Sequence, residues 1–459
     1  MDVSVELRRP ALPSVQADAA PARQAINIGS GVAAAALAPR ASIWRRASPW
    51  LWDILLFAYV LSGGLLFDAR LALGEHVSVN QVLGTLSLAH IAYSLFAGRS
   101  PRTVLSMTWV AAAALTLVLA LRALDTPNAP YGRYKVVSYA TMVLPMLLHV
   151  QLHVRRRGDV ERVLWVATLA MFALVASSIP HMQSMQGGQR LAVLGGGPNT
   201  LARHIGTGLI AASVLLGLRG RRDRRAAALV AGLLVAAVAL FLTGTKAVLL
   251  SLGLTSLFFF WRLGRRKTLA MIIAVLLVAA LLPLATHDLV QGFQKDGGLV
   301  RLLRLPDVDD PNGSYGSRLR YVTGTWDELR TSPWLGVGTG AWGMQLGLPY
   351  DEAYPHNIFL EVVGELGVVG LALVLGACGV YALRRGARRA ARGSRRGLLA
   401  VGIGSLLVYW TLNVQFSGDL VDSRYLWLWL AMFELHRRIA HDVVPAQQPI
   451  VNRPTHAQV

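Results

Sequence analysis

Long apolar blocks separated by short polar intervals run through most of the chain. Most of these blocks are close to the length of about 20 residues that an α-helix needs to cross the roughly 30 Å core of a bilayer. They lie at 49–67, 78–97, 103–123, 136–154, 160–179, 200–218, 226–243, 247–261, 268–286, 357–383, 397–416 and 424–436. The pattern predicts an all-α, polytopic membrane protein with about twelve transmembrane helices.

Arginine and lysine gather in every second polar interval between these blocks. The basic intervals are 98–102, 155–162, 219–225, 262–267 and 384–396. This alternation is typical of cytoplasmic loops under the positive-inside rule, so we expect both termini in the cytoplasm. The same distribution explains the net charge of +20 without a nucleic-acid partner, because the bases form short clusters between spans.

A long polar interval divides the chain into two helical parts. We expect a disordered cytoplasmic tail at 1–47, about nine transmembrane helices at 48–286 and about three at 357–440. Between them, 287–356 forms a large loop on the periplasmic face, and 441–459 is a second cytoplasmic tail.

The composition agrees with a membrane protein. Apolar residues make up 54% of the chain and the mean hydropathy is +0.46, above the values of ordinary soluble domains. The single cysteine, Cys378, lies inside an apolar block, which excludes an intrachain disulfide and a cysteine-based metal site.

Polar residues gather around the start of the block at 200–218, on the predicted outer face. Arg190 lies in the preceding loop, and Asn199 is expected to cap the helix. Arg203 and His204 lie about one turn into the span, where a charge costs up to roughly 2.5–3.5 kcal/mol and usually has a partner or a function. Side chains near a helix end can also reach the interface simply to be solvated, so both interpretations stay open.

Two further outer-face features carry a cation. The turn TGTK at 243–246 ends in Lys246, which begins a span where a helix N-terminus can bind an anion. An ordinary interfacial lysine fits the same position. In the large loop, Arg318 and Arg320 precede the glycine-rich turn GVGTG, which lacks the lysine and hydroxyl of a nucleotide-binding phosphate loop.

His356 and Asn357 lie directly before the apolar block at 357–383. An imidazole can accept a proton from a sugar hydroxyl near neutral pH, and cations suit a diphosphate. A loop histidine that only packs against its neighbours is the competing interpretation. We therefore expect the outer face to bind a charged, lipid-linked substrate.

The large loop resembles the O-antigen ligase and polysaccharide polymerase family. The residues that carry this resemblance are Ser317, Arg318, Pro333, Gly336, Gly338, Gly340, His356, Asn357, Glu365, Gly367 and Gly370. The earlier stretch RLAVLGGGPN is similar to the family's arginine-containing loop, which puts Arg190 and Asn199 on family positions. Lys246 stands where arginine is usual, and a lysine lacks the bidentate guanidinium fork.

The resemblance implies a glycosyltransferase of the bacterial inner membrane that needs no metal ion or other cofactor. It would move a glycan from undecaprenyl diphosphate to a sugar hydroxyl of lipid A-core or of a growing surface polysaccharide, with inversion; close relatives also glycosylate proteins. His356 and Arg318 would be catalytic. The residues expected to bind substrate are Arg190, Asn199, Arg203, Lys246, Arg320 and Asn357.

A transporter or flippase of an anionic or lipid-linked substrate is the alternative. Such a protein usually places its ionisable residues near the bilayer midplane, in broken helices. In this sequence they lie at the predicted outer ends of spans and in the large loop, which favours chemistry at the membrane surface.

Overall fold

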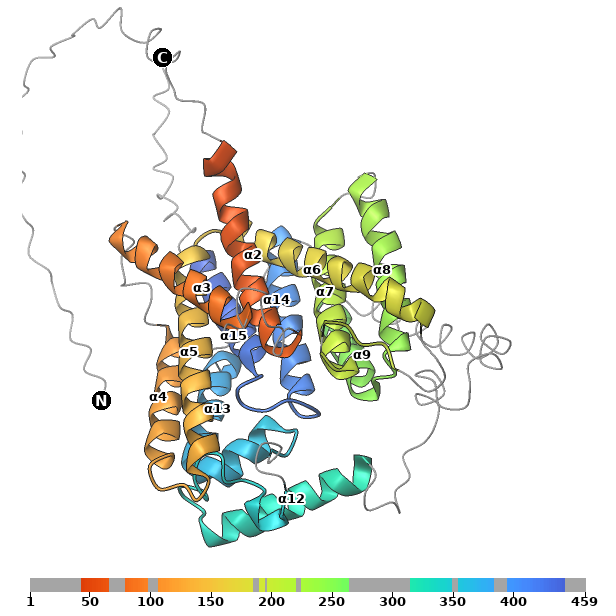
Figure 1. Ribbon diagram of the computed structural model, residues 1–459. Helices are drawn as coiled ribbons and strands as arrows, with labels where there is room; N and C mark the ends of the chain where they lie inside the picture. The colour runs from red at the N-terminus through yellow and green to blue at the C-terminus, as the bar shows by residue number, and fades with distance from the viewer. Residues whose placement is uncertain are drawn as a thin grey trace, which may run out of the picture. The chain divides into compact units, whose positions relative to one another are not determined.

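The computed structural model describes residues 43–65, 79–97, 106–184, 190–194, 196–219, 224–263, 314–348, 354–383 and 394–441. The chain divides into two compact units, Met1–Ser48 and Pro49–Val459. The helices are α2 Ile43–Leu65, α3 Val79–Phe96, α4 Met107–Arg122, α5 Ala129–His153, α6 Arg157–Ser184, α7 Pro198–Leu218, α8 Arg224–Leu242, α9 Lys246–Leu263, α12 Ser314–Thr331, α13 Ile358–Leu383, α14 Arg395–Asn413 and α15 Arg424–His441 (Figure 1).

The described part of the chain is all-helical, as predicted. It contains twelve α-helices and one short 3₁₀-helix, Met344–Leu346, and no strand forms among the described residues. Four described helices are long and apolar enough to cross a membrane: α5, α6, α7 and α13. The number of about twelve spans and the side on which each loop lies stay predictions.

Eleven of the predicted apolar blocks coincide with helices. The block at 268–286 lies outside the described residues, as do most of both predicted tails and residues 287–313 of the large loop. α2 begins at Ile43, inside the range expected for the first tail. The helix α12 was not predicted, because its sequence mixes polar and apolar residues without a long apolar block.

The helices α7, α14 and α15 form much of the buried core. Gly206 on α7 lies against the ring of Tyr409 on α14, and the Tyr409 hydroxyl donates a hydrogen bond to the backbone carbonyl of Arg203 (3.1 Å). The indole of Trp410 stacks on Tyr425 of α15 with ring centroids 4.3 Å apart. This packing holds Arg203 next to the connection between α14 and α15.

The helix α13 is broken at Gly367, where φ is 63° and ψ is −158°. The break takes the N–H groups of Val368 and Val369 out of the regular helical pattern. They donate instead to the carbonyls of Pro333 (2.9 Å) and Trp334 (3.2 Å). A residue with a side chain is strained in this conformation, which explains glycine at the break.

The glycine-rich turn at 333–340 also donates hydrogen bonds to α13. The N–H groups of Val337 and Gly338 donate to the carbonyls of Gly364 (2.8 Å) and Glu365 (3.1 Å). Gly336 has a φ of 66°, and a side chain there would meet the backbone of residues 364 and 365. The glycines therefore shape a turn that docks into the break of α13, and this docking orients the preceding helix, α12.

Candidate functional site

Three polar side chains from separate segments of the chain converge on the connection between α14 and α15, residues 414–423. Arg203 of α7 donates to the Ser417 hydroxyl (2.6 Å), and Arg318 of α12 donates to the Phe416 carbonyl (3.3 Å). Asn357, directly before α13, donates to the carbonyl of Gln415 (3.3 Å). Segments far apart in the sequence thus meet at one connection, called the 414–423 segment below.

Arg318 is the most accessible of these three side chains. Its guanidinium lies 5.8 Å from the centroid of the Phe416 ring, and partial burial lowers the pKa of Arg318 from its ordinary value. An arginine carries five N–H donors and stays protonated in proteins. Arg320 lies two residues further along α12, on a different face of the helix, and is exposed, so the structure does not bring it beside Arg318.

His356 directly precedes Asn357, two residues before the first residue of α13. Its φ of 52° is unusual for a residue with a side chain. Its ring centroid is 4.6 Å from that of Tyr354 and 6.3 Å from that of Tyr321 on α12. The side chain of Asn357 caps α13 by accepting from the N–H groups of Phe359 (2.9 Å) and Leu360 (3.2 Å). The backbone that carries His356 is therefore fixed on its C-terminal side by the start of α13.

Arg190 forms a second cluster with the turn between α8 and α9. It donates to the Thr243 carbonyl (2.9 Å), the Thr245 hydroxyl (2.9 Å) and the Asn199 side-chain oxygen (3.0 Å). The expectation that Asn199 caps α7 is wrong: Gly197 occupies the N-cap position, and the Asn199 side chain turns to Arg190 instead. Lys246, the first residue of α9, is exposed at the edge of this cluster.

The helix α7 connects the two clusters. Asn199 and Arg203 are four residues apart on this helix, so their side chains lie on the same face, one turn from each other. The structure thus brings Arg190, Asn199 and Arg203 along one side of α7. Arg318, His356 and Asn357 approach the 414–423 segment from α12 and α13.

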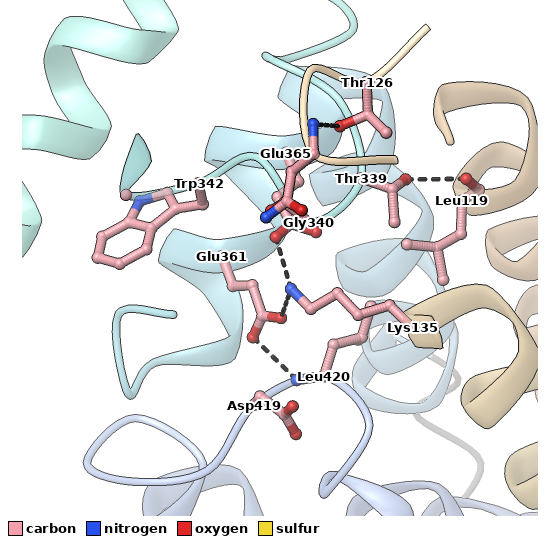
Figure 2. A network of polar contacts seen from close by, with 12 residues as sticks. Leu119, Thr126, Lys135, Thr339, Gly340, Trp342, Glu361, Glu365, Asp419 and Leu420 are labelled. Atoms are coloured by element: carbon pink, nitrogen blue, oxygen red, sulfur yellow. Dashed lines mark hydrogen bonds and ion pairs between the residues drawn. The ribbon is translucent and has the colours of Figure 1, made fainter. Parts of the chain in front are cut away.

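A buried ion cluster, which sequence reasoning missed, lies beneath this site (Figure 2). The ammonium of Lys135 on α5 is 2.5 Å from a carboxylate oxygen of Glu361 and 2.5 Å from one of Glu365, both on α13. Glu361 also accepts the N–H of Leu420 in the 414–423 segment (2.8 Å). A charge at or inside a membrane span needs a partner, so a lysine directly before one apolar block and two glutamates inside another were the available signal.

A further buried carboxylate, Glu328, attaches α12 to the same assembly. It accepts the N–H of Gly343 (3.3 Å), and the neighbouring Thr325 hydroxyl accepts the indole N–H of Trp342 (2.8 Å). Burial raises the pKa of Glu328 from 4.5 to about 7. The inner face of α12 is thus polar, and it fixes the helix that presents Arg318.

Part of the chain matches a known family model. Residues 231–375 match the family model described as O-antigen ligase, a range that includes Lys246, Arg318, Arg320, His356 and Asn357. No curated protein matches the chain. The matched family and the long apolar helices indicate a bacterial membrane protein and support a role in polysaccharide or lipopolysaccharide biosynthesis. The match over residues 231–375 supports the resemblance of this part of the chain to the O-antigen ligase and polysaccharide polymerase family.

Proposed function

We propose that this protein transfers a glycan from undecaprenyl diphosphate to a sugar hydroxyl at the periplasmic face of the inner membrane. The observation that carries the proposal is the convergence of Arg203, Arg318 and Asn357 on the 414–423 segment beside His356. The acceptor would be lipid A-core or a growing polysaccharide, as the family suggests.

The arginines supply what a diphosphate leaving group requires. As the bond to the sugar breaks, negative charge grows on the diphosphate, and guanidinium groups stabilise such a charge through strong, charge-assisted hydrogen bonds. Arg318 is exposed beside the site and has N–H groups beyond the one that contacts Phe416. Arginines can therefore do the work that a metal ion does in other transferases, and we propose a metal-independent reaction.

His356 is the proposed base for the acceptor. The oxygen of the acceptor hydroxyl forms a bond to the anomeric carbon of the donor while the bond from that carbon to the diphosphate oxygen breaks. Undecaprenyl diphosphate leaves with the electron pair, and the hydroxyl proton passes to the imidazole. Attack on the face opposite the leaving group inverts the anomeric carbon. The unusual backbone of His356, held by the Asn357 cap, supports a positioned rather than an incidental side chain.

A transporter or flippase is the second candidate, because broken helices with nearby ionisable residues are common in transporters. The break at Gly367 and the adjacent Glu365 fit that description. However, the backbone groups released by the break already bind residues 333–338, and Glu365 is paired with Lys135. These groups serve the protein's own structure, which favours the transferase.

Reconstitution in vesicles with an undecaprenyl-diphosphate-linked glycan and separate candidate acceptors tests the proposal. We expect a glycan–acceptor product of inverted anomeric configuration and an equal amount of undecaprenyl diphosphate. Fluorescent donor in one leaflet allows movement across the bilayer to be followed in the same vesicles. Movement of intact donor without product, for every acceptor tried, would establish the transporter instead.

A further inference from the structure

The described surface of α12 has an unusual distribution of polar and apolar residues. The side that packs against the protein is small and polar, with Gly324, Thr325 and Glu328 buried. Its large apolar side chains are exposed instead: Tyr315, Leu319, Val322 and Trp326 are 47%, 54%, 49% and 55% exposed. A helix that lay in water beside the protein would be expected to show the reverse pattern.

These four apolar residues form one continuous stripe. Their spacing of four, three and four residues places them on a single side of an α-helix. Contiguous apolar surface of this kind commonly marks a site of interaction with a protein or a membrane. We call it the α12 stripe, residues 315, 319, 322 and 326.

Basic side chains border the α12 stripe. On a helical projection, Arg318 flanks one side of the stripe and Arg330 flanks the other. The Arg330 guanidinium lies 5.5 Å from the centroid of the Trp326 ring. Aromatic and aliphatic residues flanked by arginines are typical of helices that lie in the membrane interface, where arginines contact anionic headgroups.

The turn that follows α12 places this surface at the level of a spanning helix. Trp334 is 70% exposed and Leu335 is exposed beside it. The Trp334 carbonyl accepts the N–H of Val369, which lies within the candidate span of α13. Val368 and Val369 are themselves exposed on that span. The apolar surface of the turn is therefore continuous with apolar surface of a helix that enters the membrane.

Figure 1 shows α12 lying crosswise to the axes of α4 and α5. A helix in this orientation at the end of a spanning bundle runs along the membrane surface rather than through it. We infer that α12 is an interfacial helix whose stripe is buried in the headgroup and acyl-chain boundary of the outer leaflet. This contact would hold Arg318, on the same helix, at the depth where the diphosphate of a lipid-linked molecule lies.

Spin labels on α12 test this inference directly. Cys378→Ala removes the single native cysteine, and single cysteines then replace Leu319 or Val322 in the stripe. Thr323→Cys and Asp327→Cys are matched controls, because both residues are exposed on the polar side of the same helix. The full chain is reconstituted in phosphatidylethanolamine and phosphatidylglycerol vesicles without substrate.

Collision rates with oxygen, which partitions into lipid, and with a water-soluble nickel chelate are measured at each label. We expect the oxygen-to-nickel ratio to be several-fold higher at 319 and 322 than at 323 and 327. Equal ratios at all four positions would show that the stripe lies in water and overturn the inference. Labels at 319 and 322 that are immobile and reached by neither reagent would also overturn it, since a second copy or another protein segment would then cover the stripe.

Discussion

Arg190 and Arg318 are both predicted to bind the donor diphosphate, but their surroundings differ. The guanidinium of Arg190 donates to three acceptors of the protein itself, in the turn between α8 and α9 and on α7. Arg318 makes one hydrogen bond, at 3.3 Å, to the described part of the chain, and its side chain is exposed beside Phe416 of the 414–423 segment.

This difference separates two ways in which an arginine can serve a site. A guanidinium whose N–H groups are used by the protein holds loops together and contributes charge from a distance. A guanidinium with N–H groups left over can form new bonds to a substrate. We therefore assign direct diphosphate contact to Arg318 and a mainly positioning role to Arg190, and each prediction below changes one side of this comparison.

The largest expected effect belongs to the proposed base rather than to either arginine. His356→Ala should lower turnover by about 10²- to 10⁴-fold, the contribution typical of a positioned base. Steady-state transfer at saturating acceptor measures this effect. His181→Ala, at an exposed histidine near the end of α6, is the matched control and should retain turnover. Normal turnover of His356→Ala would leave the base assignment without support.

Arg318→Ala should lower kcat/KM for the donor by about 10- to 150-fold. This range corresponds to one hydrogen bond to a charged group, worth roughly 1.5–3 kcal/mol. Arg330→Ala is the control, because Arg330 is an exposed arginine of the same helix that lies away from the 414–423 segment. Equal losses in both variants would mean that the net charge of α12, rather than a contact from Arg318, supports the reaction.

Arg190→Ala should affect stability as well as transfer, in contrast to Arg318→Ala. Its three acceptors lose their partner, which should cost roughly 1.5–3 kcal/mol of folding free energy. Thermal unfolding in detergent measures the change. Arg190→Lys retains the charge but lacks the guanidinium fork, so its unfolding temperature should also fall. A stable Arg190→Ala protein that loses donor affinity would place Arg190 with Arg318 as a direct contact.

Glu328 tests the attachment of the helix that presents Arg318. Its pKa is about 7 in the folded protein and 4.5 ordinarily, so the folded state binds the proton more tightly. Its contribution to stability is therefore full below about pH 4.5 and declines until about pH 7. Glu328→Gln retains an oxygen for the Gly343 N–H and should lose this part of the pH dependence. Identical unfolding curves for the two proteins at about pH 5 and about pH 8 would argue against a raised pKa.

The smallest effect is expected at Lys246, at the edge of the Arg190 cluster. Lys246→Arg retains the positive charge and introduces the guanidinium fork. Because the side chain is exposed, transfer should change by no more than about twofold. A large loss measured in the same transfer assay would show that the turn at 243–246 requires the smaller ammonium group.

Helix positions could be predicted because the signals are local in the sequence, whereas the roles of the candidate site residues stay predictions. Apolar blocks mark helices, and the pair His356–Asn357 before a block marks a helix start. The contact between Lys135 and Glu365 could not be predicted from local signals, because the two residues are 230 positions apart in the chain. The 414–423 segment is likewise defined by side chains that reach it from α7, α12 and the residue before α13.

The wrong prediction of the α7 cap and the missing prediction of α12 both have physical reasons. Asn199 has a good capping side chain, but Pro198 favours the first helical position and shifts the cap to Gly197, which leaves Asn199 to bind Arg190. The long apolar blocks do not predict α12, because α12 has only about one residue of its apolar stripe in each helical turn.

The most direct test of the account is the binding of the carrier alone. Undecaprenyl diphosphate, without a glycan, should bind the reconstituted wild-type protein and the His356→Ala variant with similar affinity. Arg318→Ala should bind it about 10- to 150-fold more weakly, because the diphosphate loses a charge-assisted hydrogen bond. Wild-type affinity in Arg318→Ala, with the Arg330→Ala control also unchanged, would contradict the assignment of Arg318 to the diphosphate.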